Sequence, residues 1–373
     1  MADFVIKELI TNDIERELSS IGFDEGYRNT AADKFKYKNF KIYSLTVEQA
    51  NIIKQTALSV GADCGTHREV IRGNIEKSDV ILGGSYSQIK KISEKLKHQP
   101  FSLKILAENL VEQIETKRQT TKLVGILNIT PDSFSDGGKY LDEKSAQEHL
   151  MQMIQDGADM IDIGAESTRP GAKEVEADEQ IHRLKPILKF IQNENITIPI
   201  SIDTRSSEVS DFVLNNGASI INDVSGFDFD NNMAKIISKY SAGVIIQHSK
   251  GTPENMQISP KYNNLIDEIY FSLKNKIEYA KSLGIKNIIV DPGIGFGKTK
   301  EDNFEILNRI EEFYSLKCPV MVGVSRKSLL GIKTDDNELK DSLTLAISYP
   351  LILKGVDYLR VHNVKLHKTL TTL

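Results

Sequence analysis

Two carboxylates and an amide lie at or near the ends of apolar runs in the second part of the sequence. Asp203 and Asp291 each end such a run, and Asn222 lies within another. A carboxylate at the end of a buried strand is costly unless hydrogen-bond donors satisfy it. If these three side chains share one pocket, they suit a flat ligand whose edge carries several N–H donors. The alternative is that the two carboxylates form internal salt bridges.

Basic and hydroxyl side chains follow two further apolar runs. Arg360 and His362 alternate on the last run, so on a strand both would face the same way and form a cationic spot for an anion. Lys327 and Ser328 lie in a turn that could begin a helix. Free N–H groups at a helix start suit a carboxylate or a phosphate. Lys327 can donate to a ring carbonyl.

Two loops after apolar runs have compositions suited to substrate binding. The first runs from Asn128 to Gly138, includes Phe134, and is rich in proline, aspartate, serine and glycine. Its glycine pair suits a lid, and an ordinary exposed turn explains it equally well. The second loop places an arginine beside hydroxyl groups, at Thr168, Arg169 and Pro170. This pattern suits an anionic group, with a surface arginine on a turn as the alternative.

A glycine-rich segment follows Asp291 and includes Phe296. It resembles a phosphate-binding loop, but Pro292 stands where that motif requires glycine, and its spacing also differs from the dinucleotide-binding fingerprint. We therefore interpret it as a loop that lets the backbone and Phe296 approach a flat ligand.

Eight short apolar runs must position these residues, and helical patterns separate most of them. The runs span residues 123–129, 160–166, 199–203, 219–224, 243–248, 287–291, 319–324 and 357–363. The helical patterns span 145–155, 177–192, 207–215, 231–240, 265–283, 301–313 and 339–353. Near-continuous apolar content suits parallel strands buried on both faces. This alternation predicts an α/β protein with a closed TIM (β/α)8 barrel over residues 120–373, whose strand ends form one site.

Residues 1–119 are expected to form a small α/β or α+β domain, for which no role follows from the sequence. Its expected strands and helices are Asp3 to Ile10, Asp79 to Leu82, Thr46 to Val60 and Ser85 to Lys97. Lysines on the last of these helices predict a solvated outer face. Residues 102–117 have the pattern of an amphipathic helix. Because the chain ends soon after His362, we expect that helix to supply part of the cover over the seam between the eighth and first barrel strands.

Composition excludes several classes of protein. The 373 residues suit one barrel of about 250 residues with an appendage. A net charge of −5 and a pI near 5.9 provide no basic field for nucleic acid. No segment has the pattern of a signal peptide or the roughly 20 apolar residues of a membrane span. Cys64 and Cys318 lie far apart without zinc or disulfide spacing, so a cytoplasmic protein is expected.

Several segments, in the same order, resemble the motif series of the dihydropteroate synthase family. They lie within roughly residues 120–365 and are Asn128 to Gly138, Glu166 to Gly171, Ser201 to Thr204, Ile221 to Asp223, Asp291 to Lys298, Gly323 to Ser328 and Arg360 to His362. Several motifs in the same order identify a family far more specifically than any single motif does. The resemblance implies a homodimeric transferase of folate biosynthesis. It would condense 6-hydroxymethyl-7,8-dihydropterin pyrophosphate with p-aminobenzoate and release pyrophosphate.

The resemblance also implies a role for each site residue. The catalytic residues would be Asp203, Lys327, Arg360 and His362. The pterin edge would be held by Asp203, Asn222 and Asp291, with Lys327 toward the ring oxygen. The pyrophosphate would lie on Arg360 and His362, with Mg²⁺ near Asn128. The p-aminobenzoate pocket would comprise Phe134, Thr168, Arg169, Pro170, Phe296 and Ser328.

Two departures from the family pattern concern the site. Gln247 and Ser249 flank the fifth-strand histidine where relatives carry apolar residues, and Asn363 replaces an aspartate that could orient His362. Two alternative functions share part of the pattern. A pterin methyltransferase that uses methyltetrahydrofolate has no need of the anion spot at Arg360 and His362. A non-catalytic pterin-binding protein would bind pterin without turnover.

Overall fold

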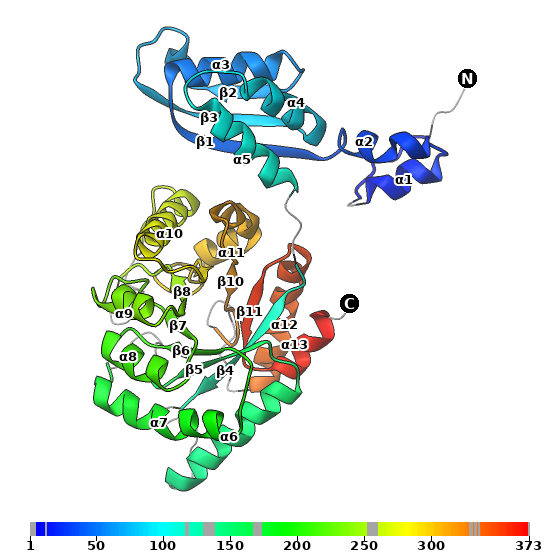
Figure 1. The fold of residues 1–373 in the computed structure, drawn as a ribbon. Coiled ribbons are helices and arrows are strands. Elements are labelled where there is room, and N and C mark those ends of the chain that lie inside the picture. Colours follow the sequence, from blue (N-terminus) through cyan, green and yellow to red (C-terminus); the bar gives the residue numbers. More distant parts are fainter. Residues whose placement is uncertain are drawn as a thin grey trace. The chain divides into compact units, whose positions relative to one another are not determined.

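The chain divides into two compact units in a computed structural model (Figure 1). Unit 1 is Met1–Lys117 and unit 2 is Arg118–Leu373. The structure describes residues 5–11, 13–115, 119–129, 139–166, 174–251, 260–327, 331, 334 and 336–371, without the side chains of 139–142. The sequence-based domain boundary, between residues 119 and 120, lies close to this division.

Unit 2 is an eight-stranded parallel sheet in the order β10-β11-β4-β5-β6-β7-β8-β9. The strands are β4 (Lys122–Asn128), β5 (Met160–Gly164), β6 (Ile200–Asp203), β7 (Ile220–Asp223), β8 (Gly243–Gln247), β9 (Ile288–Asp291), β10 (Met321–Val322) and β11 (Tyr358–Val361). A parallel bridge between Val290 and Val320 joins β9 to the segment that leads into β10. The predicted TIM barrel is therefore confirmed, with β10 much shorter than the predicted run.

Helices follow the strands and surround the ring (Figure 1). They are α6 (Lys139–Gln155), α7 (Ala177–Asn193), α8 (Ser207–Asn215), α9 (Met233–Lys239), α10 (Leu265–Ser282), α11 (Lys300–Asn308), α12 (Asn337–Leu353) and α13 (Val364–Thr371). The predicted helix at residues 301–313 is divided, because α11 ends at Asn308 and a 3-10 helix, η4 (Ile310–Leu316), follows it.

The pleat of the strands determines which side chains face the barrel interior. A buried apolar layer near the strand starts comprises Val124, Met160, Ile220, Ile245, Ile289 and Met321, with Tyr358 packed against it. Side chains alternate along a strand, so residues two positions further on face the same interior. On β5, β7, β8, β9 and β11 these are Asp162, Asn222, Gln247, Asp291 and Arg360. A polar layer therefore lies above the apolar one, toward the carboxyl ends of the strands, where TIM barrels carry their sites.

The seam between β11 and β4 is covered by α13, the helix that follows the last strand. Gly125 of β4 allows this close packing, since a Cβ atom there would lie 3.2 Å from Val364 Cγ2 and 2.8 Å from Met153 Sδ. Residues 102–117 were expected to supply part of this cover, but the apolar face of their helix is buried within unit 1. The helix is α5 (Leu103–Glu115), and its buried residues are Leu103, Ala107, Leu110 and Ile114.

Unit 1 is an α+β fold around a three-stranded antiparallel sheet in the order β1-β3-β2. Besides α5, its elements are α1 (Ile14–Ser20), η1 (Glu25–Tyr27), α2 (Arg28–Ala32), β1 (Tyr37–Thr46), α3 (Val47–Leu58), β2 (Asp63–Thr66), η2 (Arg68–Val70), β3 (Lys77–Ser85) and α4 (Tyr86–Leu96). Capping boxes at Thr46 and Ser85 begin α3 and α4, two of the three helices predicted for this unit. Residues 5–10 form no strand, contrary to the expectation.

Candidate active site

A buried charged network spans three neighbouring strands of the barrel interior and β11. Arg360 Nε donates to Asp162 Oδ2 at 2.6 Å, and Arg360 Nη2 donates to Asp203 Oδ2 at 3.1 Å. The same oxygen of Asp162 accepts from Asn222 Nδ2 at 2.9 Å. Arg360, predicted to bind an anion, and Asp203, predicted to bind a flat ligand, thus belong to one network. The salt-bridge alternative considered for Asp203 is also realised here, with Arg360 as the partner.

Several oxygen atoms of this network face no hydrogen-bond donor among the described residues. The buried oxygens without a partner are Asp162 Oδ1, Ser201 Oγ, Asp203 Oδ1 and Asn222 Oδ1. Leaving a buried polar atom unpaired costs about 1–3 kcal/mol, so most native proteins avoid it. A row of unpaired acceptors on β5, β6 and β7 is the arrangement expected of a site that receives a ligand rich in N–H donors.

Burial dominates the titration of the two carboxylates that end strands. Burial raises the pKa of Asp203 to about 7; Arg360 opposes the shift, and the nearby carboxylates of Asp162 and Glu166 add to it. Burial also raises the pKa of Asp291, against the effects of Lys327 and of a hydrogen bond from Gly293 N at 2.7 Å. Both acids therefore hold a proton more readily in the ligand-free protein than on an exposed surface.

Lys327 lies beside Arg360 and above the ring of Phe296. A Cβ atom at Gly323 would lie 3.9 Å from Lys327 Nζ and 3.6 Å from Arg360 Cβ, so the two cations share one side of the site. Lys327 Nζ donates to Ile294 O at 2.6 Å and lies 4.7 Å from the centre of the Phe296 ring. Burial lowers the pKa of Lys327 to about 8, while the nearby Asp291 acts to raise it. Lys327 therefore lies close to both Phe296 and Asp291.

The glycine-rich segment after β9 packs directly on the end of β8. A Cβ atom at Gly293, where φ is +73°, would lie 1.8 Å from His248 O, so no side chain fits there. The buried Lys298 ties the segment down: its Nζ donates to Phe296 O at 2.9 Å and to His248 O at 3.3 Å, and lies 3.0 Å from His248 Nδ1. Burial lowers the pKa of Lys298 to about 7. These contacts fix the backbone that carries Phe296.

His362 has a hydrogen-bond partner that the sequence reasoning missed. Ser325 Oγ accepts from His362 N at 3.2 Å and lies 2.9 Å from His362 Nδ1, which fixes the ring plane in either tautomer. Asn363 serves another purpose, since its Oδ1 accepts from Leu366 N at the start of α13 and its Nδ2 donates to Asp341 Oδ2 at 3.1 Å. The replacement of aspartate by Asn363 therefore does not leave His362 without an orienting group.

Asn128 and Gln247 complete the described part of the interior rim. A Cβ atom at Gly164 would lie 3.4 Å from Asn128 Oδ1 and 3.7 Å from Asp203 Cβ, so the amide at the end of β4 lies close to Asp203. Gln247 is buried and its Nε2 is 3.4 Å from Val224 O, which draws its amide toward the loop after β7.

Some predicted site residues lie outside the described residues. They are Phe134, Thr168, Arg169, Pro170 and Ser328. The described flank of the second predicted loop is held by an ion pair between Glu166 Oε1 and Arg205 Nη2 at 3.0 Å. Val175 N also donates to Glu166 Oε1, so the returning end of that loop is tied to the same carboxylate.

The sequence reasoning also missed Asp162 as a site residue. Its signal was present, because Asp162 lies two positions after Met160 of the apolar layer and so faces the interior. Ser201 pairs with Asp162 in the strand register and carries one of the unpaired buried oxygens.

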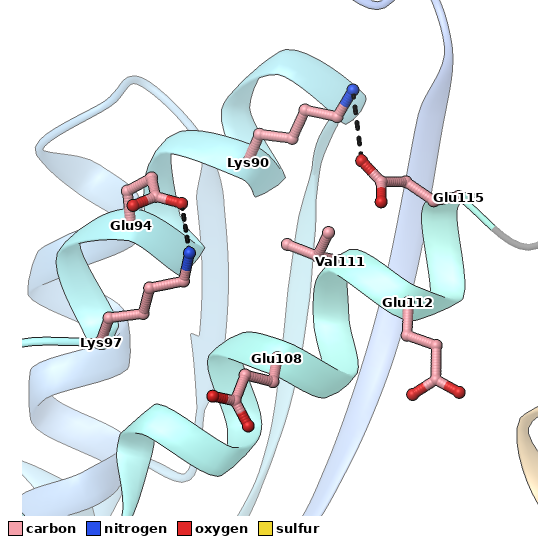
Figure 2. Close-up of a pocket in the computed structure, with 7 residues that line it drawn as sticks. All are labelled: Lys90, Glu94, Lys97, Glu108, Val111, Glu112 and Glu115. Carbon is pink, nitrogen blue, oxygen red and sulfur yellow. Dashed lines mark hydrogen bonds and ion pairs between the residues drawn. The ribbon is translucent and has the colours of Figure 1, made fainter.

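A groove outside the barrel lies between α4 and α5 of unit 1 (Figure 2). Its lining residues are Lys90, Glu94, Lys97, Glu108, Val111, Glu112 and Glu115. Lys90 bonds to Asp33 at 2.8 Å and lies 3.9 Å from Glu115, and Lys97 pairs with Glu94. The groove is therefore an ion-paired surface, and it contains none of the predicted site residues.

Comparison with known proteins places the similarity on the barrel and, for some relatives, on both units. A family model described as pterin binding enzyme matches residues 124–362. A dihydropteroate synthase of Clostridium beijerinckii is 44% identical over 250 residues, which cover 66% of this chain and 90% of that protein. The bifunctional dihydropteroate synthase/dihydropteroate reductase of Helicobacter pylori is 33% identical over 368 residues, covering 97% of this chain and 96% of that protein.

A solved structure and a longer relative extend this picture. The crystal structure of a dihydropteroate synthase from Clostridium difficile in the presence of pteroic acid superposes with a TM-score of 0.63 at 40% identity, covering 69% of this chain and 95% of that chain. The chain spans only 40% of the length of a probable bifunctional folylpolyglutamate synthase/dihydropteroate synthase of Haloferax volcanii, with 34% identity over 345 residues. Among the described residues, no helix is both long and apolar enough to cross a bilayer.

Proposed function

Since this chain belongs to the dihydropteroate synthases of the pterin binding enzyme family, and is therefore a transferase of folate biosynthesis, we propose that its barrel joins 6-hydroxymethyl-7,8-dihydropterin pyrophosphate to p-aminobenzoate. The single observation that carries the proposal is the row of unpaired acceptors beside Arg360. A pterin presents amino and ring N–H donors along one edge. Asp203 Oδ1 and Asn222 Oδ1 are buried acceptors without a donor among the described residues, so they suit that edge. Asp291 and Lys327 would complete the ring contacts.

The pyrophosphate would leave toward the cationic side of the site. Arg360 and His362 would bind its oxygens, because Arg360 already lies in the polar layer and Ser325 fixes the ring of His362. In the reaction, the C–O bond between the pterin methylene and the pyrophosphate breaks and a C–N bond to the arylamine forms, with loss of one amine proton. The carboxylates of Asp203 and Asp291 would stabilise positive charge that develops on the pterin methylene.

Mg²⁺ fits this site as an ion bound mainly through the substrate. The described residues contain no group of three or more His, Cys, Asp or Glu side chains arranged to hold a metal ion. Mg²⁺ keeps several waters and is often bound by one or two protein oxygens together with substrate phosphates. Asn128 Oδ1, close to Asp203, would supply the protein oxygen. When bound, Mg²⁺ would neutralise charge on the departing pyrophosphate.

The amine substrate is proposed to lie against Phe296. Lys298 fixes the backbone of this residue through the Phe296 carbonyl, so its ring can flank a flat aryl group. Phe134, Thr168, Arg169, Pro170 and Ser328 stay proposed members of the same pocket. An arylamine is neutral at pH 7, so the pocket needs to position the amine rather than to deprotonate it before attack.

A coupled assay of pyrophosphate release tests this function. Release should require Mg²⁺ and both substrates, and Asp203→Ala or Lys327→Ala should lower the rate by about 100-fold or more. A matched control is Asp159→Asn, because the Asp159 carboxylate accepts from Leu123 N near the opposite end of the barrel. Pterin binding without turnover would favour a non-catalytic binding protein. Methyl transfer from methyltetrahydrofolate would favour the methyltransferase alternative.

A second activity, dihydropteroate reduction, has one observation in its favour. The Helicobacter pylori relative that carries both activities in its name aligns with nearly the whole chain, unit 1 included. Reduction of 7,8-dihydropteroate adds two electrons and two protons across a C=N bond, so it requires a reduced flavin or a reduced nicotinamide. Incubating the full chain with dihydropteroate and each reductant should yield tetrahydropteroate. A chain that is an active synthase but consumes neither reductant would exclude this second activity.

A homodimer in the cytoplasm also stays a proposal. Exposed apolar residues on α12 support a contact between two copies, since Leu353 is 70% exposed and Tyr349 is 44% exposed. Sedimentation of the full chain should give twice the mass of 41.8 kDa. Leu353→Lys should then shift the equilibrium to monomer, and a wild-type monomer at micromolar concentration would contradict the dimer.

A further inference from the structure

Asp162 is the most buried charged residue of the polar layer, and the proposed reaction assigns it no role. It is completely buried on β5. One of its oxygens, Oδ2, accepts from both Arg360 Nε at 2.6 Å and Asn222 Nδ2 at 2.9 Å. One carboxylate oxygen therefore holds two side chains that come from different sides of the barrel, β11 and β7.

The contact with Asp162 sets the direction of the Asn222 amide. An amide has a donor end and an acceptor end of nearly the same shape, so its orientation depends on its neighbours. A flipped amide would place Asn222 Oδ1 against a carboxylate oxygen, and two acceptors in contact repel. The amide therefore directs Nδ2 to Asp162 and leaves Oδ1 as a buried acceptor without a partner among the described residues.

The same carboxylate also fixes the guanidinium of Arg360. An arginine is planar, and binding its Nε on one side determines where its Nη atoms point. With Nε held by Asp162, Nη2 reaches Asp203 Oδ2 at 3.1 Å. Without Asp162, the bond to Asp203 would be the remaining side-chain contact of Arg360 among the described residues, and the guanidinium could rotate.

We propose that Asp162 is a positioning residue that makes Asn222 an acceptor toward the ligand and holds Arg360 in register with Asp203. Its consequence is specificity: a heterocycle with an N–H or amino group opposite Asn222 binds, and one with a lone pair there is rejected. This inference rests on the proposed function, because it deepens the recognition of the pterin ring.

Binding of 6-hydroxymethylpterin to the full chain, measured by fluorescence or calorimetry, tests the role of Asp162 separately from the proposed function. Asp162→Ala should weaken pterin binding by about 10- to 100-fold, since a buried hydrogen-bonded partner is lost. The KM for p-aminobenzoate should change less than about twofold. Asp162→Asn keeps an oxygen for Arg360 and Asn222, so it should restore most of the binding. Asp159→Asn, the carboxylate control at the other end of the barrel, should bind like the wild type.

A double-mutant cycle with Asn222→Ala decides whether Asp162 acts through Asn222. If it does, adding Asp162→Ala to Asn222→Ala should weaken binding much less than the product of the two single effects. If Asp162→Ala does not fold, the same cycle with Asp162→Leu, which removes the acceptor but fills the space of the side chain, answers the question. Additive effects, or pterin binding by Asp162→Ala equal to the wild type, would overturn the inference while leaving the proposed function intact. A wild type that binds no pterin would overturn the proposed function instead.

Discussion

Arg360 Nη2 lies 3.1 Å from Asp203 Oδ2, so the guanidinium expected to bind an anion is bonded to the carboxylate expected to bind the heterocycle. Arg360 also bonds to Asp162 at 2.6 Å. The groups proposed to bind the diphosphate and the ring of the pterin substrate are therefore neighbours in the ligand-free protein. A diphosphate that binds Arg360 will change the electrostatic field at Asp203. A pterin ring that binds Asp203 will likewise change the field at Arg360.

Arg360→Lys should lower kcat/KM by about 100-fold, because a lysine ammonium cannot reproduce a fork that reaches two carboxylates at once. Steady-state kinetics with both substrates measures the loss. Arg309→Lys is a matched control: Arg309 also bridges two carboxylates, Glu305 and Glu312, but at the exposed junction of α11 and η4. Its effect should be within about twofold, since exposed ion pairs contribute little. Equal effects of the two variants would contradict a special role for Arg360.

Pterin binding should tighten as pH rises from 5.5 to 7.5. Burial raises the pKa of Asp203 from 3.8 to about 7, and only the ionised carboxylate accepts N–H donors with both oxygens. Stability has the opposite sign. Between pH 3.8 and 7 the folded protein binds more protons than the unfolded chain, so the free energy of unfolding contributed by Asp203 falls as pH rises through this window.

Asp203→Asn separates these two effects, because it removes the ionisation and keeps the shape. The melting temperature of Asp203→Asn minus that of the wild type should increase from pH 5 to pH 8. The pterin affinity of the variant should be weak and independent of pH. Thermal melts and binding titrations at several pH values provide both readouts. A wild-type affinity that stays flat across this range would count against Asp203 as the titrating group.

Asn363→Asp should destabilise the protein even though it restores the residue usual in the family. Asn363 Nδ2 donates to Asp341 Oδ2 at 3.1 Å, so an aspartate would bring two carboxylates together beside Arg326. We expect a loss of about 1–3 kcal/mol at pH 8 by urea denaturation. The double variant Asn363→Asp/Asp341→Asn exchanges the charges and should recover most of the loss. A double variant no more stable than Asn363→Asp alone would exclude this pairing.

The barrel was predictable because short, near-continuous apolar runs alternate with helical patterns along the sequence. Asp203, Asn222, Asp291 and Arg360 were predicted to share one site because they lie at the ends of these runs, which meet at one end of a barrel. Asp162 was missed because it lies in the middle of its strand rather than at its end. The contact of Ser325 with His362 joins residues 37 positions apart and depends on how two strands align, which no local pattern states.

The sheet of unit 1 was harder to predict because half of it faces solvent. In β1, exposed Lys38, Asn39 and Lys41 interrupt the half-buried Phe40 and Ile42, so no apolar run marks the strand. Its pairing with β3 over a long register supplies the missing stability. The helices α3 and α4 were predicted because capping residues and a helical period are local signals.

Lys298→Met should cost about 2–4 kcal/mol of unfolding free energy and raise the KM for p-aminobenzoate. The buried ammonium satisfies Phe296 O and His248 O, and lies against His248 Nδ1, so its loss leaves these acceptors unpaired beneath the Phe296 backbone. Lys274→Met is the control, because Lys274 is 49% exposed and only approaches Glu278 at 3.9 Å. Denaturation and kinetics of both variants test this, and a wild-type KM in a stable Lys298→Met protein would refute it.

Val364→Asp should disrupt the barrel far more than removal of unit 1 does. Val364 is 2% exposed and packs against Gly125 at the seam between β11 and β4, so a charge there would be buried without a partner. Lys365→Asp, at the next and exposed position of α13, should be nearly neutral. The fragment of residues 118–373 should melt cooperatively, because its core cluster consists of its own residues. A molten fragment together with a stable Val364→Asp protein would mean that unit 1, and not α13, completes the barrel.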